Sequence, residues 1–244
     1  MSVVMGGHTN YGFLVGIMML ETRFPRVPGD IGNALTFSFP VLYKVVPGLS
    51  PSRRITGESS FPLEAFIETG RWLIREGVKT IVTSCGLLAL YQGELAQSLK
   101  VPVFSSSLLQ IPLVYAATGR RVGVLTADER ALGKRHFESV GASGIPVAVE
   151  GIRESYFWNV LNNDFSELDV ALAEQDVLQA GRRLVAHWSD IGAIVLECTN
   201  FPPFAKSIQQ ALGLPVYDMV TLTHMAYETV CRKSYRDGCD ERKG

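Results

Sequence analysis

Two segments of the chain are degenerate copies of each other, each built around a cysteine that closes an apolar run. An Ile-Val pair stands four and three residues before Cys85, and the same pair stands at the same spacing before Cys198. Pro102 follows the first cysteine by 17 residues, and Pro215 follows the second by 17. Two glycines in each copy extend the agreement, Gly16 with Gly123 and Gly70 with Gly181. Matches that keep their order along the chain predict a duplicated structural unit.

Duplication has a chemical consequence, because two copies related by a pseudo-two-fold axis bring equivalent positions to one cleft. Cys85 and Cys198 would then flank one ligand. A carbon held between two thiols can lose its proton to one sulfur and regain a proton from the other on its opposite face, which inverts a stereocentre. The repeat therefore predicts two-thiol acid–base catalysis.

Short, β-branched apolar runs alternate with helical patterns along the whole chain. Such runs, joined by helices, are typical of parallel sheets covered by helices on both faces, so we expect an α/β fold. The predicted strands are residues 13–20, 81–83, 101–104, 122–126, 194–196 and 215–217. The predicted helices are residues 62–75, 88–99, 109–117, 129–140, 168–187, 204–212 and 221–233.

The repeat divides the chain into two pseudo-symmetric lobes with a cleft between them. The first lobe is expected to hold residues 11–115 and to take back residues 216–233, and the second to hold residues 118–215. Residues 234–244 form a charged tail. Ligands of open α/β sheets bind at the carboxyl ends of strands, which is where both cysteines fall.

Residues 21–61 are rich in proline and glycine and predict a long irregular connection. Loops of this length inside compact domains are often functional, so the segment is a candidate lid or oligomer contact. An ordered surface excursion is the alternative. Four charged residues after the first strand are candidates for substrate contact or for plain solvation, namely Glu21, Arg23, Arg26 and Asp30.

Composition limits the classes of partner. At 244 residues with a formal net charge of −1, the chain can bury a core and gives no reason to expect nucleic acid or a membrane surface as partner. No early run is long enough to span a bilayer and no basic signal region precedes it, so we expect a cytoplasmic protein with reduced cysteines. Small molecules are the expected ligands.

No cofactor or metal is predicted. The four histidines, and the tail cysteines Cys231 and Cys239, lack the spacing of zinc ligands. Neither a phosphate-binding glycine loop nor a lysine at a predicted strand end occurs, so nucleotides and pyridoxal phosphate are not implied.

The residues around each cysteine suit acid–base work on a carboxylate. A helix is expected to begin after Gly86 and another after Asn200, and a helix amino terminus lowers the pKa of a thiol. Backbone N–H groups beside Gly86, Thr199 and Asn200 are candidates to bind a substrate carboxylate, with the hydroxyls of Ser84 and Thr199 as further contacts. The alternative, two small buried hydrophobic cysteines, does not explain their matched positions.

On these residues the chain resembles the aspartate/glutamate racemase superfamily, which includes hydantoin and allantoin racemases. The matching motifs are residues 83–86 and residues 197–200, although many members have Asn-Thr where Gly86 and Leu87 stand. The resemblance implies a cofactor-independent enzyme that forms a dimer or larger oligomer. It also implies that Thr126 and Ala127 contact a substrate carboxylate, while Thr126 as a helix N-cap is an equal alternative.

The function expected first is a racemase or epimerase, an isomerase acting at a carbon beside a carboxylate or a cyclic carbonyl, with an amino acid or a hydantoin as substrate. Cys85 and Cys198 would alternate as acid and base. A maleate cis–trans isomerase or an arylmalonate decarboxylase with the same fold is the nearest alternative. A non-catalytic small-molecule binding protein is another.

Overall fold

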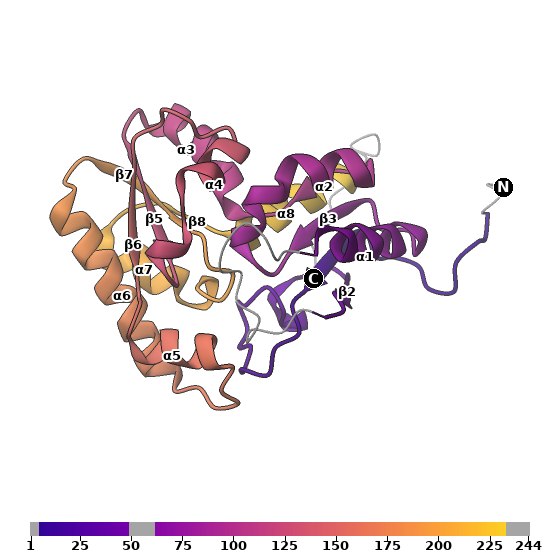
Figure 1. The fold of residues 1–244 in the computed structure, drawn as a ribbon, viewed down its shortest axis with the longest axis horizontal. Helices are drawn as coiled ribbons and strands as arrows, with labels where there is room; N and C mark the ends of the chain where they lie inside the picture. Colours follow the sequence, from indigo (N-terminus) through magenta and orange to yellow (C-terminus); the bar gives the residue numbers. More distant parts are fainter. Residues whose placement is uncertain (1–4, 49–61, 233–244) are drawn as a thin grey trace, which may run out of the picture.

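The structure, a computed structural model, describes residues 5–48 and 62–232 and divides them between two lobes that lie side by side (Figure 1). Each lobe holds a four-stranded sheet in which every paired strand runs parallel. The first sheet has the order β2-β1-β3-β4, from β1 (Val15–Met19), β2 (Val41–Val45), β3 (Thr80–Thr83) and β4 (Val103–Phe104). The second has the order β6-β5-β7-β8, from β5 (Arg121–Thr126), β6 (Val147–Gly151), β7 (Ile191–Leu196) and β8 (Val216–Tyr217). The two orders are the same, which confirms the predicted α/β fold.

Helices follow the strands in both halves. The α-helices before the second sheet are α1 (Leu63–Arg75), α2 (Gln92–Leu99) and α3 (Ile111–Thr118). Those after its first strand are α4 (Lys134–Ser139), α5 (Tyr156–Asn163), α6 (Val170–His187), α7 (Ala205–Leu212) and α8 (Met219–Val230). Short 3₁₀ helices are η1 (Ala34–Thr36), η2 (Gly86–Tyr91), η3 (Ser107–Gln110), η4 (Glu129–Ala131) and η5 (Pro202–Phe204).

The last helix of each half crosses to the other lobe. Ile111 and Val114 of α3 pack into one apolar cluster with Val124 of the second sheet. Met219 and Leu222 of α8 pack into another, together with strands of the first sheet. Figure 1 shows α3 beside β5 and β7, and α8 behind α2. The exchange ties the lobes together through buried apolar contacts, which stabilise a fixed pairing of the two halves.

These contacts correct the expected lobe boundaries. The range 11–115 placed α3 in the first lobe, whereas its apolar face covers the second sheet. The range 216–233 placed β8 in the first lobe, whereas it pairs with β7. The chain therefore returns to the first lobe after Tyr217. The tail, residues 234–244, lies outside the described residues.

The repeated glycines are explained by close packing of a helix on a strand. A Cβ on Gly16 would meet the side chain of Leu73 at 3.1 Å, and a Cβ on Gly123 would meet that of Leu184 at 2.9 Å. Such distances are tighter than ordinary van der Waals contact, so a larger residue would force the leucine of α1 or α6 to shift away from its sheet. The two halves share this contact as well as their topology.

Two strands and one helix were not predicted. β2 and β6 are edge strands that are partly exposed, and α5 is a short helix between β6 and α6. β2 forms inside the segment expected to be irregular, where it pairs with β1 along five residues. Residues 21–48 are thus an ordered part of the first lobe, and the remainder, residues 49–61, lies outside the described residues. A role as lid or oligomer contact stays a prediction.

Candidate active site

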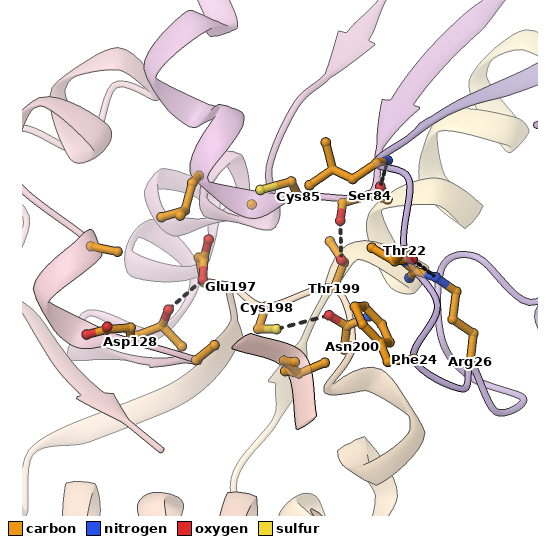
Figure 2. A pocket seen from close by; sticks show the side chains of 17 residues that line it. Thr22, Phe24, Arg26, Ser84, Cys85, Asp128, Glu197, Cys198, Thr199 and Asn200 are labelled. Carbon is orange, nitrogen blue, oxygen red and sulfur yellow. Dashed lines mark hydrogen bonds between the residues drawn. The ribbon is translucent and has the colours of Figure 1, made fainter. Parts of the chain in front are cut away.

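One cavity of about 190 Å³ lies at the carboxyl ends of the strands, where the two lobes meet. Cys85, directly after β3 and Ser84, and Cys198, directly after β7 and Glu197, both line it. Figure 2 shows the two sulfurs on opposite sides of the space between the lobes. The other predicted site residues line it too: Ser84, Gly86, Thr126, Ala127, Thr199 and Asn200.

Cys85 is half-buried and begins η2 as its N-cap residue. Burial and the nearby Glu197 carboxyl raise the pKa of its thiol to about 12, while hydrogen bonds from the backbone N–H groups of Leu87 and Leu88 act in the opposite direction. The helix terminus is therefore present, but its effect is smaller than the cost of burying a thiolate. The expected lowering of this pKa is wrong.

Cys198 is buried, and its thiol donates a hydrogen bond to Asn200 Oδ1 at 3.6 Å. Asn200 Nδ2 donates to Asp30 Oδ2 at 2.6 Å, and Asp30 Oδ1 accepts from Arg26 Nη1 at 2.7 Å. This chain of contacts links the second cysteine to the segment after β1 in the first lobe. Burial, followed by Glu197, raises the pKa of Cys198 well above its usual value, so neither cysteine is a thiolate at rest.

Ser84 and Thr199 join the lobes beside the cysteines. The hydroxyl of Thr199 donates to the backbone carbonyl of Ser84 at 2.8 Å, and the N–H of Leu20 donates to Ser84 Oγ at 2.9 Å. Both residues are buried. The Thr199 hydroxyl therefore joins the two lobes, and the Ser84 hydroxyl joins the ends of β1 and β3 within the first lobe. Any contact that either hydroxyl makes to a substrate stays a prediction.

Glu197 is the site residue that sequence reasoning missed. Its side chain is buried, and Oε2 accepts a hydrogen bond from the hydroxyl of Thr126 at 2.6 Å. Burial raises the pKa of Glu197 to about 7, against 4.5 for an ordinary glutamate. The signal was its place in the repeat, directly before the second cysteine, where the first copy has Ser84.

Thr126 and Ala127 line the cavity, but the hydroxyl of Thr126 is already used by Glu197. Thr126 does not cap the helix after it, because the N-cap of η4 is Asp128, whose side chain accepts from the N–H of Arg130 at 3.1 Å. Carboxylate binding by Thr126 and Ala127 stays a prediction, and it would require the Thr126–Glu197 hydrogen bond to rearrange.

The charged residues after β1 divide into two groups. Arg26 lines the cavity with Thr22 and Phe24, and its guanidinium lies over the Phe24 ring at 4.7 Å. Arg23 instead forms an exposed ion pair with Asp164 at 3.3 Å. Within residues 5–48 and 62–232, no cluster of histidine, cysteine and acidic side chains is arranged to hold a metal ion. No helix of that part is long and apolar enough to cross a membrane.

The geometry is that of a duplicated α/β enzyme with two facing cysteines, and sequence comparison gives the family. The family model for Asp/Glu/hydantoin racemases matches residues 110–226, which include β5, β7 and Cys198. Residues 110–226 therefore belong to the Asp/Glu/hydantoin racemase superfamily. The cavity lined by Cys85 and Cys198 is the candidate active site.

Solved structures of racemase-superfamily members share the fold. Unliganded arylmalonate decarboxylase superimposes with a TM-score of 0.61 at 16% identity, over 94% of this chain and 96% of that one. Aspartate racemase of Picrophilus torridus superimposes with a TM-score of 0.57 at 16% identity, over 90% and 94%. At this level of identity the likeness concerns the fold alone.

Curated proteins that are similar in sequence to this chain carry a different name. A dimethylsulfoniopropionate lyase of Durusdinium sp. clade D is 28% identical over 215 residues, which cover 84% of this chain and 71% of the relative. Dimethylsulfoniopropionate lyase 7 of Emiliania huxleyi is 28% identical over 229 residues, which cover 85% and 64%. The chain is therefore similar to lyases as well as to racemases.

Proposed function

We propose that this protein is a lyase that removes a proton from the carbon beside a carboxylate and expels a leaving group from the next carbon. Dimethylsulfoniopropionate is the first substrate to test. The observation that carries the proposal is the pair of thiols, Cys85 and Cys198, facing one small cavity in a chain similar to lyases of that name. A cavity of about 190 Å³ suits a substrate of few heavy atoms.

The reaction needs one base. A cysteine thiolate takes the proton from the carbon next to the carboxylate, and the C–H electron pair becomes the second bond of acrylate. The electron pair of the carbon–sulfur bond leaves with neutral dimethyl sulfide. The thiol then gives its proton to solvent, which restores the enzyme. No oxidant, reductant or cofactor enters this balance.

Cys85 is the better candidate for the base. The backbone N–H groups of Leu87 and Leu88 both lower the pKa of its thiol, whereas one backbone N–H, that of Asn200, does so at Cys198. The thiol of Cys198, in contrast, donates its proton to Asn200 Oδ1, an arrangement that favours the protonated form. Cys198 would then act as a proton or hydrogen-bond donor on the opposite face of the substrate.

The raised thiol pKa values favour a substrate that brings positive charge. A thiolate beside the Glu197 carboxyl is disfavoured, and a sulfonium group in the cavity would offset that repulsion. A substrate with two carboxylates would add to it. Dimethylsulfoniopropionate carries one positive and one negative charge, so its entry would help to form the base that attacks it.

Racemisation of a small amino acid is the second candidate. It is favoured by the same two thiols, since inversion needs a base on one face and an acid on the other. An amino acid also carries one positive and one negative charge. The two candidates differ in their products, because only the lyase breaks a bond to the neighbouring carbon.

The test measures both activities on one preparation. The full chain is incubated with dimethylsulfoniopropionate, with headspace gas chromatography for dimethyl sulfide and proton NMR for acrylate. A parallel series in D2O follows loss of the Cα proton from single-enantiomer amino acids and 5-substituted hydantoins. The variants are Cys85→Ala and, as a matched control outside the cavity, Cys231→Ala at the end of α8.

Release of dimethyl sulfide that is lost in Cys85→Ala and retained in Cys231→Ala supports the lyase. Exchange of an amino-acid proton without release of dimethyl sulfide supports the racemase instead. Absence of both activities overturns both candidates and leaves ligand binding without catalysis.

A further inference from the structure

The charges that line the cavity are segregated to its two sides. Figure 2 shows Glu197 and Asp128 on one side of the two sulfurs, and Arg26 with Thr22 and Phe24 on the other. All five of these side chains line the cavity. The acidic side belongs to the second lobe, and the basic side to the segment after β1 of the first. A ligand between the thiols therefore meets opposite charges at its two ends.

The acidic side has an acceptor that no protein group uses. Glu197 is 3% exposed, and within the described part of the chain its Oε1 has no hydrogen-bond partner, while Oε2 accepts from Thr126. Asp128 is less available, because it caps η4 and lies 3.9 Å from Arg153. Among the described residues no side-chain oxygen is both fully buried and without a hydrogen-bond partner, so Oε1 is open to the cavity, where a ligand can approach it. Glu197 is thus the acceptor for a cationic group.

The basic side holds a guanidinium that is fixed in place. Arg26 Nη1 donates to Asp30 at 2.7 Å, and Nη2 donates to Thr22 Oγ1 at 3.0 Å. The Phe24 ring lies against the guanidinium plane, and the side chain is 12% exposed. Each terminal nitrogen carries two N–H groups and makes one hydrogen bond within the described residues, so a second N–H on each can donate to an anion. Arginine binds carboxylates through such paired donors.

We propose that the cavity selects small zwitterions, with the substrate carboxylate on Arg26, the cationic group against Glu197, and the reacting carbon between Cys85 and Cys198. This inference rests on the proposed function for the identity of the reaction and adds the orientation of the substrate. It also predicts which ligands bind weakly. A dicarboxylate would place its second carboxylate against Glu197, where like charges repel in a buried setting.

The test is a binding experiment that needs no turnover. Isothermal titration calorimetry on the full chain compares four probes: 3-(trimethylammonio)propionate as zwitterion, trimethylsulfonium as cation, propionate as anion and succinate as dianion. The variants are Glu197→Gln and Arg26→Gln, with Arg26→Lys as the conservative form. The exposed residues Glu167 and Arg75 give matched controls as Glu167→Gln and Arg75→Gln. Circular dichroism and thermal unfolding establish that each variant is folded.

Each of the two substitutions is expected to weaken the binding of a different probe. Glu197→Gln weakens trimethylsulfonium binding at least 10-fold and leaves propionate unchanged, whereas Arg26→Gln weakens propionate at least 10-fold and leaves trimethylsulfonium unchanged. The zwitterion binds wild type more tightly than succinate and is weakened by both substitutions. Arg26→Lys restores part of the propionate affinity. The surface variants match wild type.

Three results overturn the inference: succinate binding more tightly than the zwitterion, no zwitterion binding to wild type, or both substitutions acting equally on all probes. These results are distinct from failure of the lyase proposal. A protein that releases no dimethyl sulfide can still sort the probes by charge. If the protein is an active lyase but substitution of Glu197 or Arg26 changes no probe affinity, this inference alone is overturned.

Discussion

The carboxyl group of Glu197 occupies the space that a side chain on Gly86 would need. A Cβ placed on Gly86 would collide with both Oε1 and the backbone carbonyl of Glu197. The two residues come from different lobes and stand directly beside the two cysteines. The repeat pairs Gly86 with Thr199, whose hydroxyl donates to the carbonyl of Ser84. The glycine and the glutamate are therefore a matched departure from the symmetry of the two halves.

Gly86→Ala is expected to disrupt the site. The added methyl group forces Glu197 or the lobe contact to move, which should lower the free energy of unfolding by about 1–3 kcal/mol. Activity on the proposed substrate should fall more than 10-fold. The control is Gly93→Ala in α2, where a Cβ meets nothing within 4 Å. Urea unfolding of that variant should give a stability equal to wild type or higher by about 0.5–1 kcal/mol.

Glu197→Gln should stabilise the protein in a pH-dependent way. Because the pKa of Glu197 is raised from 4.5 to about 7, the folded protein holds a proton that the unfolded chain has lost. Wild-type stability therefore falls as pH rises from 4.5 to 7, and glutamine lacks this loss. The difference in unfolding free energy should grow from near zero at pH 4.5 to on the order of 3 kcal/mol at pH 8. Urea unfolding at both pH values measures it. An equal difference at both would contradict a buried, protonated Glu197.

The thiol of Cys85 should be alkylated slowly in the ligand-free protein. With its pKa raised to about 12, its thiolate fraction at pH 8 is more than about 100-fold below that of a free cysteine. Iodoacetamide labelling, followed by peptide mass spectrometry against N-acetylcysteine as reference, measures the rate. Glu197→Gln should speed the labelling of Cys85, because the negative charge that raises this pKa is removed. Rapid labelling of wild type at neutral pH would reinstate a resting thiolate.

The glycines under α1 and α6 should respond alike. Gly16→Ala pushes a methyl group against Leu73, and Gly123→Ala pushes one against Leu184. Each should lower the free energy of unfolding by about 1–3 kcal/mol, because neither helix can shift without disturbing its sheet. Chemical denaturation of both variants compares them. If one substitution were harmless and the other severe, the two halves would not share this packing.

Much of the fold could be predicted from the sequence because the repeat is carried by short buried strands. Buried strands need unbroken apolar runs, and the six runs recognised all form strands in the structure. β2 and β6 were not predicted because they are partly exposed and a charged residue, Lys44 or Glu150, interrupts each apolar run. The packing of α3 on the second sheet and of α8 on the first was also not predicted. A helix pattern gives an apolar face, but which sheet covers that face depends on how the lobes pack.

Some residues of the candidate active site could be predicted from the sequence, and others could not. Cys85 and Cys198 could be placed at facing strand ends because the repeat marks equivalent positions. Glu197 could not, because a glutamate is ordinarily exposed and nothing local signals that the other lobe will bury it. The prediction that the thiol pKa values are lowered was wrong for the same reason. A helix terminus is visible in the sequence, whereas the burial that outweighs it arises only when the lobes meet.

Because the two halves are joined in one polypeptide, the two walls of the cleft can carry different side chains. If two identical half-chains associated about a true two-fold axis, every group on one wall of the empty cleft would recur on the other. Here Glu197 stands where its counterpart is Ser84, and Gly86 where its counterpart is Thr199. Because one polypeptide carries both walls, a residue on one wall can differ from the equivalent residue on the other. A molecule with unlike ends can then enter in a single direction, which no homodimer of either half would impose.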